Sequence, residues 1–142
     1  MKSVNLIAVF AANKPGQLEQ ITRVLADERI NIRLITFATS EKFGVVKLLV
    51  DQPEKAGRTL RKRGWTVSRL AVLALEVPDQ PGGLHAVADC LARHGINVEN
   101  SSGFVANRRA VLLVEVQALA RARRTLASEK FQLLSRDDLL AL

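Results

Sequence analysis

Two short Pro-Gly turns carry the residues of this sequence that are best suited to binding chemistry. The first is Asn13-Lys14-Pro15-Gly16-Gln17-Leu18, and it recurs 66 positions later as Asp79-Gln80-Pro81-Gly82-Gly83-Leu84. An apolar periodic segment that predicts a helix follows each turn, so the N–H groups of residues 16–18 and 82–84 should be unpaired. Such donors at the positive end of a helix dipole suit a carboxylate or a phosphate. Asn13 or Asp79 could hold an ammonium group beside that anion.

The surroundings of the two turns are repeated as well. Residues 9–67 align without gaps on residues 75–133, with thirteen identical pairs in fifty-nine. Ile30-Asn31-Ile32 matches Ile96-Asn97-Val98, and Trp65 matches Phe131. The chain is therefore predicted to be two copies of one unit, with domain boundaries at residues 1–69 and 70–142.

Each copy reads as strand, helix, strand, strand, helix, strand. In the first copy, residues 4–11, 30–39, 43–51 and 65–69 read as strands, with Asn13 as the cap of the first helix and Gly64 closing the second. No linker separates Arg69 from Leu70, where the second copy begins. The order βαββαβ predicts an α+β fold of two ferredoxin-like units. We expect them to lie side by side as an eight-stranded antiparallel sheet with four helices on one face.

The composition is that of a globular protein rather than a membrane or disulfide-stabilised one. Apolar residues make up 48% of the chain, and its apolar runs are too short to cross a bilayer. A single cysteine predicts a reducing, cytoplasmic setting. The net charge of +7 comes from 21 Lys and Arg against 14 Asp and Glu, and much of the excess falls on the two second-helix segments. It is typical of solvated helix faces, with a nucleic-acid surface as the alternative.

The turn motif followed by Ile30-Asn31-Ile32, within a 66-residue βαββαβ unit, resembles the ACT domain family. The resemblance spans roughly residues 4–135 and implies a stand-alone tandem ACT protein. ACT domains bind small effectors, mostly amino acids, at interfaces between paired domains, and regulate amino-acid metabolism. The resemblance therefore implies a free amino acid as effector, a homodimer, a possible enzyme partner, and no cofactor.

The same resemblance implies which residues contact the effector. They come from the two turns and from the start of the second strand of each copy: Asn13, Gly16, Gln17, Leu18, Asn31, Asp79, Gly82, Gly83, Leu84 and Asn97. Asp79 replaces the usual asparagine, and the apolar Ala11 and Val77 stand where many members carry a polar residue. Because Asp79 offers a charged partner to an ammonium group and Gly83 an extra glycine, we predict that the second copy holds the tighter site.

A metal or catalytic site is not predicted. Cys90 and His94 are four residues apart in one predicted helix, with His85 nearby, but Cys90 matches the apolar Val24 and His94 suits a helix C-terminus. No nucleophile–base pair or catalytic motif occurs. The alternatives to an amino-acid sensor are a ligand-free regulatory subunit, such as that of acetohydroxyacid synthase, and an RNA-binding module. Phe37, Phe43 and Phe104 do not form the aromatic signature that the RNA-binding module requires.

Overall fold

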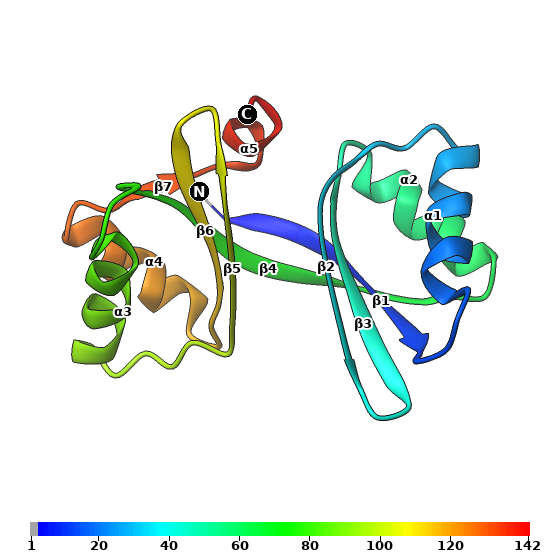
Figure 1. Cartoon of the computed structure of the whole chain (residues 1–142), viewed down its shortest axis with the longest axis horizontal. Coiled ribbons are helices and arrows are strands. Elements are labelled where there is room, and N and C mark those ends of the chain that lie inside the picture. Colours follow the sequence, from blue (N-terminus) through cyan, green and yellow to red (C-terminus); the bar gives the residue numbers. More distant parts are fainter. Residues whose placement is uncertain (1–2) are drawn as a thin grey trace. The chain divides into compact units, whose positions relative to one another are not determined.

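The computed structural model describes residues 3–142 (Figure 1). By contact density the chain forms two compact units, one of Asn5–Leu70 and one of Ala71–Leu142 together with Ser3 and Val4. The elements run in the order β1 Val4–Ala12, α1 Gln17–Asp27, β2 Ile32–Ser40, β3 Phe43–Val50, α2 Pro53–Lys62, β4 Thr66–Val77, α3 Gly83–Arg93, β5 Asn100–Ala106, β6 Arg109–Glu115, α4 Leu119–Ser128, β7 Gln132–Leu134 and α5 Arg136–Leu140.

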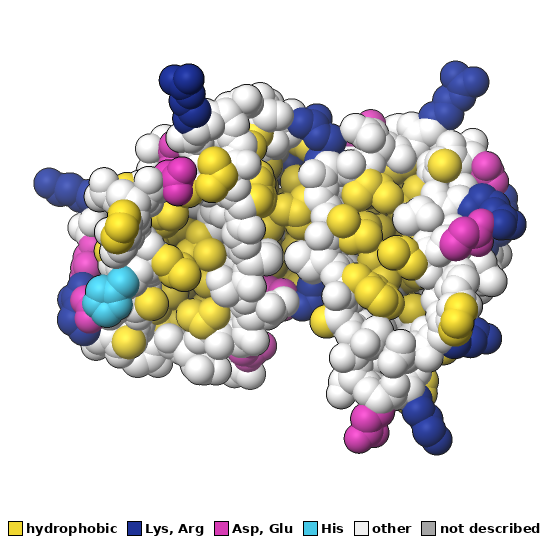
Figure 2. All heavy atoms as spheres, in the orientation of Figure 1, with side chains coloured by type: hydrophobic (Ala, Val, Ile, Leu, Met, Phe, Trp, Pro, Cys, Tyr) yellow, Lys and Arg dark blue, Asp and Glu magenta, His cyan; other side chains and the backbone are white. Residues whose placement is uncertain are grey.

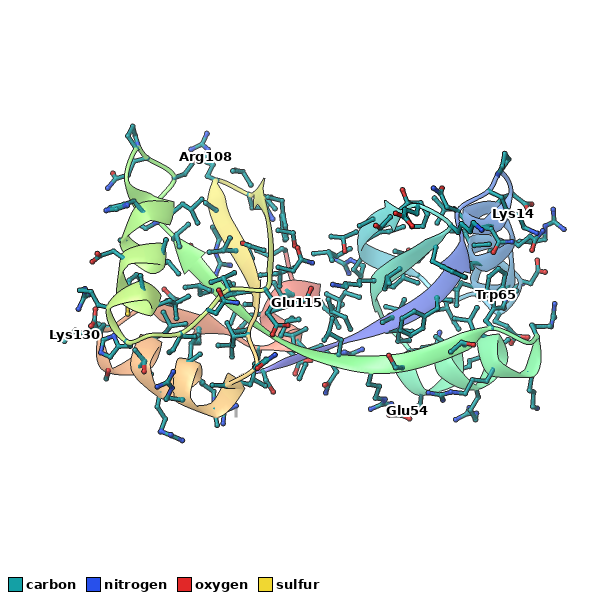
Figure 3. All side chains as sticks on the ribbon, turned by 90° about the horizontal axis from the view of Figure 1, so that it is seen from below. Lys14, Glu54, Trp65, Arg108, Glu115 and Lys130 are labelled. Atoms are coloured by element: carbon teal, nitrogen blue, oxygen red, sulfur yellow. The ribbon has the colours of Figure 1, made fainter. Side chains whose placement is uncertain are left out.

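In the first unit, two helices cover one face of an antiparallel sheet ordered β2-β3-β1-β4. The sheet side chains that face the helices, such as Val9, Val46 and Leu48, are buried against Ile21 and Leu25 of α1 and Leu60 of α2. Trp65 is half-buried and packs against the same core (Figure 3). The apolar period of the helices and the alternation of the strands thus meet in one core.

The second unit repeats this plan with β5-β6-β4-β7. Its core joins Leu73 and Leu75 of β4 with Val87 and Leu91 of α3 and Leu126 of α4. Helices α1 and α3 begin and end 66 positions apart, as the repeat predicts. By the repeat of 66 positions, the strand predicted at residues 30–39 corresponds to residues 96–105 in the second copy. That strand is shorter in the structure, since β5 begins only at Asn100.

The prediction of eight strands and four helices is wrong in detail: residues 3–142 contain seven strands and five helices. The fourth strand of copy one and the first strand of copy two are one uninterrupted strand, β4, because no turn-forming residue separates Arg69 from Leu70. The fifth helix, α5, follows the repeat. It begins with a capping box in which the Ser135 hydroxyl accepts from the Asp138 N–H, and the Asp138 carboxylate accepts from the Ser135 N–H.

Among the described residues, no helix has the length and apolar character that a membrane span requires.

Candidate functional site

Each of the two Pro-Gly turns ends in a glycine with the same left-handed backbone. Gly16 has φ 90° and ψ −10° and caps α1, while Gly82 has φ 89° and ψ −9° and caps α3. Glycine adopts this region without a steric penalty. A side chain at either position would project into open space, with no atom of the structure within 4 Å of a Cβ. The approach to both helix N-termini is therefore open.

The prediction that Asn13 caps its helix is wrong. Helix α1 begins at Gln17, and no side chain caps it. The Asn13 carboxamide instead donates from Nδ2 to the Glu41 carbonyl (2.8 Å), and the Asn13 N–H donates to the Lys42 carbonyl (2.7 Å). Asn13 thus ties the turn to the tip of the β2–β3 hairpin, where Glu41 has a left-handed φ of 55°. The neighbouring Lys14 is exposed and labelled in Figure 3.

Asp79, which replaces Asn13 in the second copy, is exposed and has no side-chain N–H with which to make the same bond. Within residues 3–142 its carboxylate has neither a hydrogen-bond partner nor an ion-pair partner. The two turns share a backbone conformation, but among the described residues only the second presents an uncommitted carboxylate.

Gln17 and Gly83 occupy the first helical position of α1 and α3 and are used in different ways. Gln17 Oε1 accepts a hydrogen bond from the Ala12 N–H at 3.1 Å. In copy two, a Cβ at position 83 would lie 2.2 Å from the Pro78 carbonyl oxygen, and the Gly83 N–H already donates to the Gln80 carbonyl. The close contact with Pro78 therefore explains why this residue is glycine, and Gly83 no longer supports a closer approach of the ligand to the backbone.

The structure does not bring Asn31 to the turn of its own unit. Helix α1 separates them, and eleven residues of α-helix extend about 16 Å. The N–H of Asn31 donates to Asp51 Oδ1 (3.0 Å), and the Asp51 N–H returns a bond to the Asn31 carbonyl (3.2 Å). Asn97, likewise beyond the end of α3, lines a pocket of about 230 Å³ with Gln117 and Arg121.

Leu18 and Leu84, the last residues of the two turn motifs, are both exposed. Leu84 lines an apolar pocket of about 220 Å³ together with Val98 and Leu112. Figure 2 shows apolar side chains gathered between the first helix and the edge strand of each unit. These residues are available to a ligand or to another protein surface.

A larger pocket, of about 430 Å³, lies beside the Gly82 turn. Gly82 and Gly83 line it together with three charged side chains that the sequence analysis did not select, Glu76, Glu129 and Lys130. Glu76 is held by Arg109 through two hydrogen bonds of 2.8 and 3.0 Å, and this contact keeps the pKa of Glu76 below its usual value. No sequence motif connects these residues, because the fold brings them to the turn from β4 and from the segment between α4 and β7.

The ends of α3 and α4 are joined by a further charged network. Arg93 donates to both oxygens of Glu129 (3.2 and 2.9 Å) and to Asp89 Oδ2 (2.9 Å). Its hydrogen bond to Glu129 is the main reason why the pKa of that carboxyl is lowered. His94, predicted only to favour the helix end, lies beside this network, whereas His85 is exposed on the first turn of α3.

Comparison with known proteins identifies the family to which these units belong. A family model described as an ACT domain pair matches residues 2–142. Protein BT0572 from Bacteroides thetaiotaomicron superposes with a TM-score of 0.92 at 28% identity, over 99% of this chain and 98% of that chain. No curated protein matches the sequence.

Two regulatory subunits have a similar fold at lower identity. The ligand-free regulatory subunit of aspartate kinase from Thermus thermophilus has a TM-score of 0.61 at 16% identity, over 89% of this chain and 92% of that chain. The corresponding subunit from Thermus flavus has a TM-score of 0.58 at 14% identity, over 90% and 92%. With two βαββαβ units and a family match that covers nearly its whole length, the chain belongs to the ACT domain family as an ACT domain pair.

Proposed function

We propose that this ACT domain pair is a non-catalytic regulatory protein that binds a free amino acid at its glycine turns. The observation that carries the proposal is the pair of open helix N-termini behind Gly16 and Gly82. In α1 the first intrahelical hydrogen bond runs from the Gln20 N–H to the Gly16 carbonyl, and in α3 from the Ala86 N–H to the Gly82 carbonyl. The N–H groups of the helical residues before Gln20 and Ala86 have no acceptor within the helix and point out of its N-terminus. An amino-acid carboxylate would accept from Leu18 and Glu19 in copy one, or from Leu84 and His85 in copy two.

The second copy remains our choice for the tighter site, and the reason is now Asp79 alone. Gly83 is explained by packing, but the Asp79 carboxylate is uncommitted and suits the ammonium group of an amino acid. In copy one the carboxamide of the equivalent Asn13 is uncharged, and its Nδ2 already donates to the Glu41 carbonyl. The pocket of about 430 Å³ that Gly82 and Gly83 line lies beside this turn, but Asp79, Leu84 and His85 are not part of its wall.

We further propose that a second copy of the chain completes the site. The edge strands β2 and β5 each pair on one side only, and Ile35, Phe37 and Val98 are exposed on or next to them. Unpaired edges and exposed apolar side chains are the usual material of a symmetric dimer. This agrees with the placement of ACT effector sites between paired domains.

The similarity in fold to regulatory subunits of aspartate kinase is the reason for proposing an enzyme of amino-acid metabolism as partner. Occupancy of the turns would alter the paired surface and so change what the partner contacts. The alternative is a ligand-free regulatory subunit, such as one of acetohydroxyacid synthase. Under that alternative the chain binds no effector.

A thermal-shift screen of the twenty amino acids tests the proposal. A ligand at 100 times its Kd stabilises the folded state by about 2.7 kcal/mol, which is several degrees in a chain of this size. We expect a shift with one amino acid or a small related group. A flat response to all twenty at millimolar concentration would contradict effector binding and leave the ligand-free subunit.

Matched glycine variants then locate the site. Gly16, Gly82 and Gly64 all have φ near 90° and open space at Cβ, but Gly64 does not begin a helix. Alanine at each position should therefore cost a similar amount, about 1–2 kcal/mol of backbone strain. Only Gly82→Ala, and more weakly Gly16→Ala, should reduce the ligand-induced shift. Equal loss of binding in all three variants would place the site elsewhere.

Calorimetry on Asp79→Asn and Asn13→Asp separates the two copies. The proposal expects affinity to fall with Asp79→Asn. If affinity falls only with Asn13→Asp, copy one is the sensor.

A further inference from the structure

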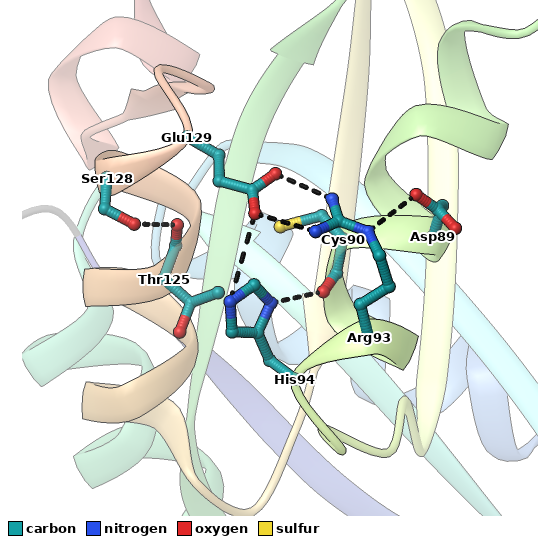
Figure 4. Close-up of polar contacts among 7 residues, drawn as sticks. All are labelled: Asp89, Cys90, Arg93, His94, Thr125, Ser128 and Glu129. Carbon is teal, nitrogen blue, oxygen red and sulfur yellow. Dashed lines mark hydrogen bonds and ion pairs between the residues drawn. The ribbon is translucent and has the colours of Figure 1, made fainter.

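Three metal-ligating side chains meet where α3 and α4 end. Cys90 and His94 belong to α3, and Glu129 follows the last residue of α4. The Cys90 sulfur, a His94 ring nitrogen and a Glu129 carboxylate oxygen all lie within 4.8 Å of one another (Figure 4). Cys90 is buried, while 41% of the His94 side chain and 30% of the Glu129 side chain are exposed. The cluster therefore has one buried side chain, Cys90, and a side that is open to solvent.

The orientation of His94 is fixed by a bond to its own helix. His94 Nδ1 lies 2.8 Å from the Cys90 carbonyl oxygen, and because a carbonyl can only accept, Nδ1 must carry the hydrogen. In the neutral ring this leaves the lone pair on Nε2, which lies 3.9 Å from Glu129 Oε1. A histidine whose second nitrogen donates to a backbone carbonyl is the arrangement that orients metal ligands in proteins.

The repeat supplies an internal reference for what the fold itself needs. The positions equivalent to Cys90, His94 and Glu129 in the first unit are Val24, Glu28 and Arg63. Val24 is buried in the core, and Glu28 pairs with Lys55 instead of with residue 63. The same helix pair thus packs without a thiol, an imidazole and a carboxylate at these places. The ligand set is specific to the second unit.

We propose that Cys90, His94 and Glu129 bind a divalent transition metal of the Zn²⁺ type, with the fourth position open to solvent. Thiolate, imidazole and carboxylate are the donors that Zn²⁺ takes, at about 2.0–2.3 Å. Tetrahedral coordination at those lengths separates the donor atoms by about 3.5 Å. In the structure His94 Nε2 and Glu129 Oε1 are 3.9 Å apart, and all three donor atoms lie within 4.8 Å of one another. Rotation of the partly exposed Glu129 side chain can make this adjustment, while His94 and buried Cys90 stay in place.

Arg93 is the competitor of the metal in this site. Its guanidinium donates to both oxygens of Glu129, and Asp89 holds it from the other side (Figure 4). A bound cation has to share or displace this guanidinium, and two positive charges close together repel each other. Removing Arg93 should therefore strengthen metal binding, whereas removing a ligand should weaken it.

Titration of the full-length chain with Co²⁺ and Zn²⁺ tests the site, with the thiol kept reduced by a non-chelating phosphine. We expect a near-ultraviolet thiolate-to-cobalt absorption band that Zn²⁺ abolishes by competition. Calorimetry should show one saturable Zn²⁺ site per chain. Absence of both the band and a saturable Zn²⁺ heat in the wild-type chain would overturn the proposal.

Two ligand variants and one control variant test the assignment. Cys90→Val installs the residue that the first unit carries at this buried place, so it should fold, and it should lose the cobalt band completely. His94→Ala should weaken Zn²⁺ binding roughly 10-fold or more, on the scale by which even supporting residues of metal sites act. His85→Ala, on the first turn of the same helix, is the control and should leave affinity unchanged.

Arg93→Ala gives the outcome that a purely structural network cannot mimic. It should tighten Zn²⁺ binding relative to wild type while the thermal stability of the metal-free chain falls through loss of the contacts to Glu129 and Asp89. Unchanged Zn²⁺ affinity in Cys90→Val and His94→Ala would refute the assignment, as would loss of binding in His85→Ala alone.

Discussion

The N–H of Ala12 donates to Gln17 Oε1 at 3.1 Å, and the second copy has lost both partners of this bond. The residue equivalent to Ala12 is Pro78, which has no N–H, and the residue equivalent to Gln17 is Gly83, which has no side chain. The side-chain oxygen of a glutamine at position 83 would find no N–H at position 78 from which to accept a hydrogen bond. Its Cβ would also lie 2.2 Å from the Pro78 carbonyl oxygen. The two substitutions between the repeats therefore form one coupled exchange.

Changing Gly83 to Gln should destabilise the chain strongly. The clash at Pro78 cannot be relieved without moving backbone, and overpacking of this kind costs about 1–3 kcal/mol. Urea unfolding of Gly83→Gln, Pro78→Ala and the double variant measures the coupling. The double variant regains the backbone N–H that copy one has at Ala12, but it keeps the carbonyl oxygen at position 78 with which the new Cβ clashes. It should therefore recover only about 1 kcal/mol of the loss, the usual contribution of one hydrogen bond. Strictly additive effects would mean that the two positions are independent.

Asn13→Ala should lower stability by about 1 kcal/mol, the usual net contribution of one hydrogen bond, because it removes the donor to the Glu41 carbonyl. Asp79→Ala is the matched control in the second copy and should cost close to nothing, since the Asp79 carboxylate has no partner among residues 3–142. Both are measured without effector by chemical denaturation. A larger loss for Asp79→Ala than for Asn13→Ala would contradict the observed contacts.

The ion pair of Glu76 and Arg109 should make the folding stability depend on pH in the acidic range. Its hydrogen bonds hold the pKa of Glu76 below the ordinary value, so the folded state binds that proton less readily than the unfolded state. The stabilisation is fully present above the ordinary glutamate pKa of 4.5 and is lost as pH falls through the lowered value. Wild type should therefore exceed Glu76→Gln in stability at pH 7, and the difference should shrink below pH 4.5. A difference that grows on acidification would have the wrong sign.

Ser135→Ala should cost about 1 kcal/mol by removing one half of the capping box that starts α5. Ser128 provides the control: its hydroxyl donates only to the exposed Thr125 carbonyl one turn back, so Ser128→Ala should have a small effect. Thermal or urea unfolding distinguishes them. Equal losses would show that α5 contributes little to the folded state.

The sequence alone determined the repeat, the order of the elements within each repeat and the family. Local chemistry was sufficient for these features: apolar periods of 3.6 and 2 placed α1 and β1 almost correctly, and glycines at 16, 64, 82 and 95 all adopt the positive φ that their turns require. The capping signal Ser135-Arg136-Asp137-Asp138 was also present in the sequence, but it follows the repeat and was missed. The count of eight strands failed because nothing in the residues around Arg69 ends a strand.

The tertiary structure decided which side chains meet. Asn13 lies three residues before Gly16, which made a helix cap the natural expectation, yet its amide reaches the Glu41 carbonyl across the sheet. Glu129 and Lys130 line the pocket at Gly82 from a distant part of the chain, and Glu129 completes the group of Cys90 and His94. Sequence spacing fixes distances only along one helix or strand. Contacts between elements depend on how their buried faces pack, and that packing is a property of the whole unit rather than of any segment.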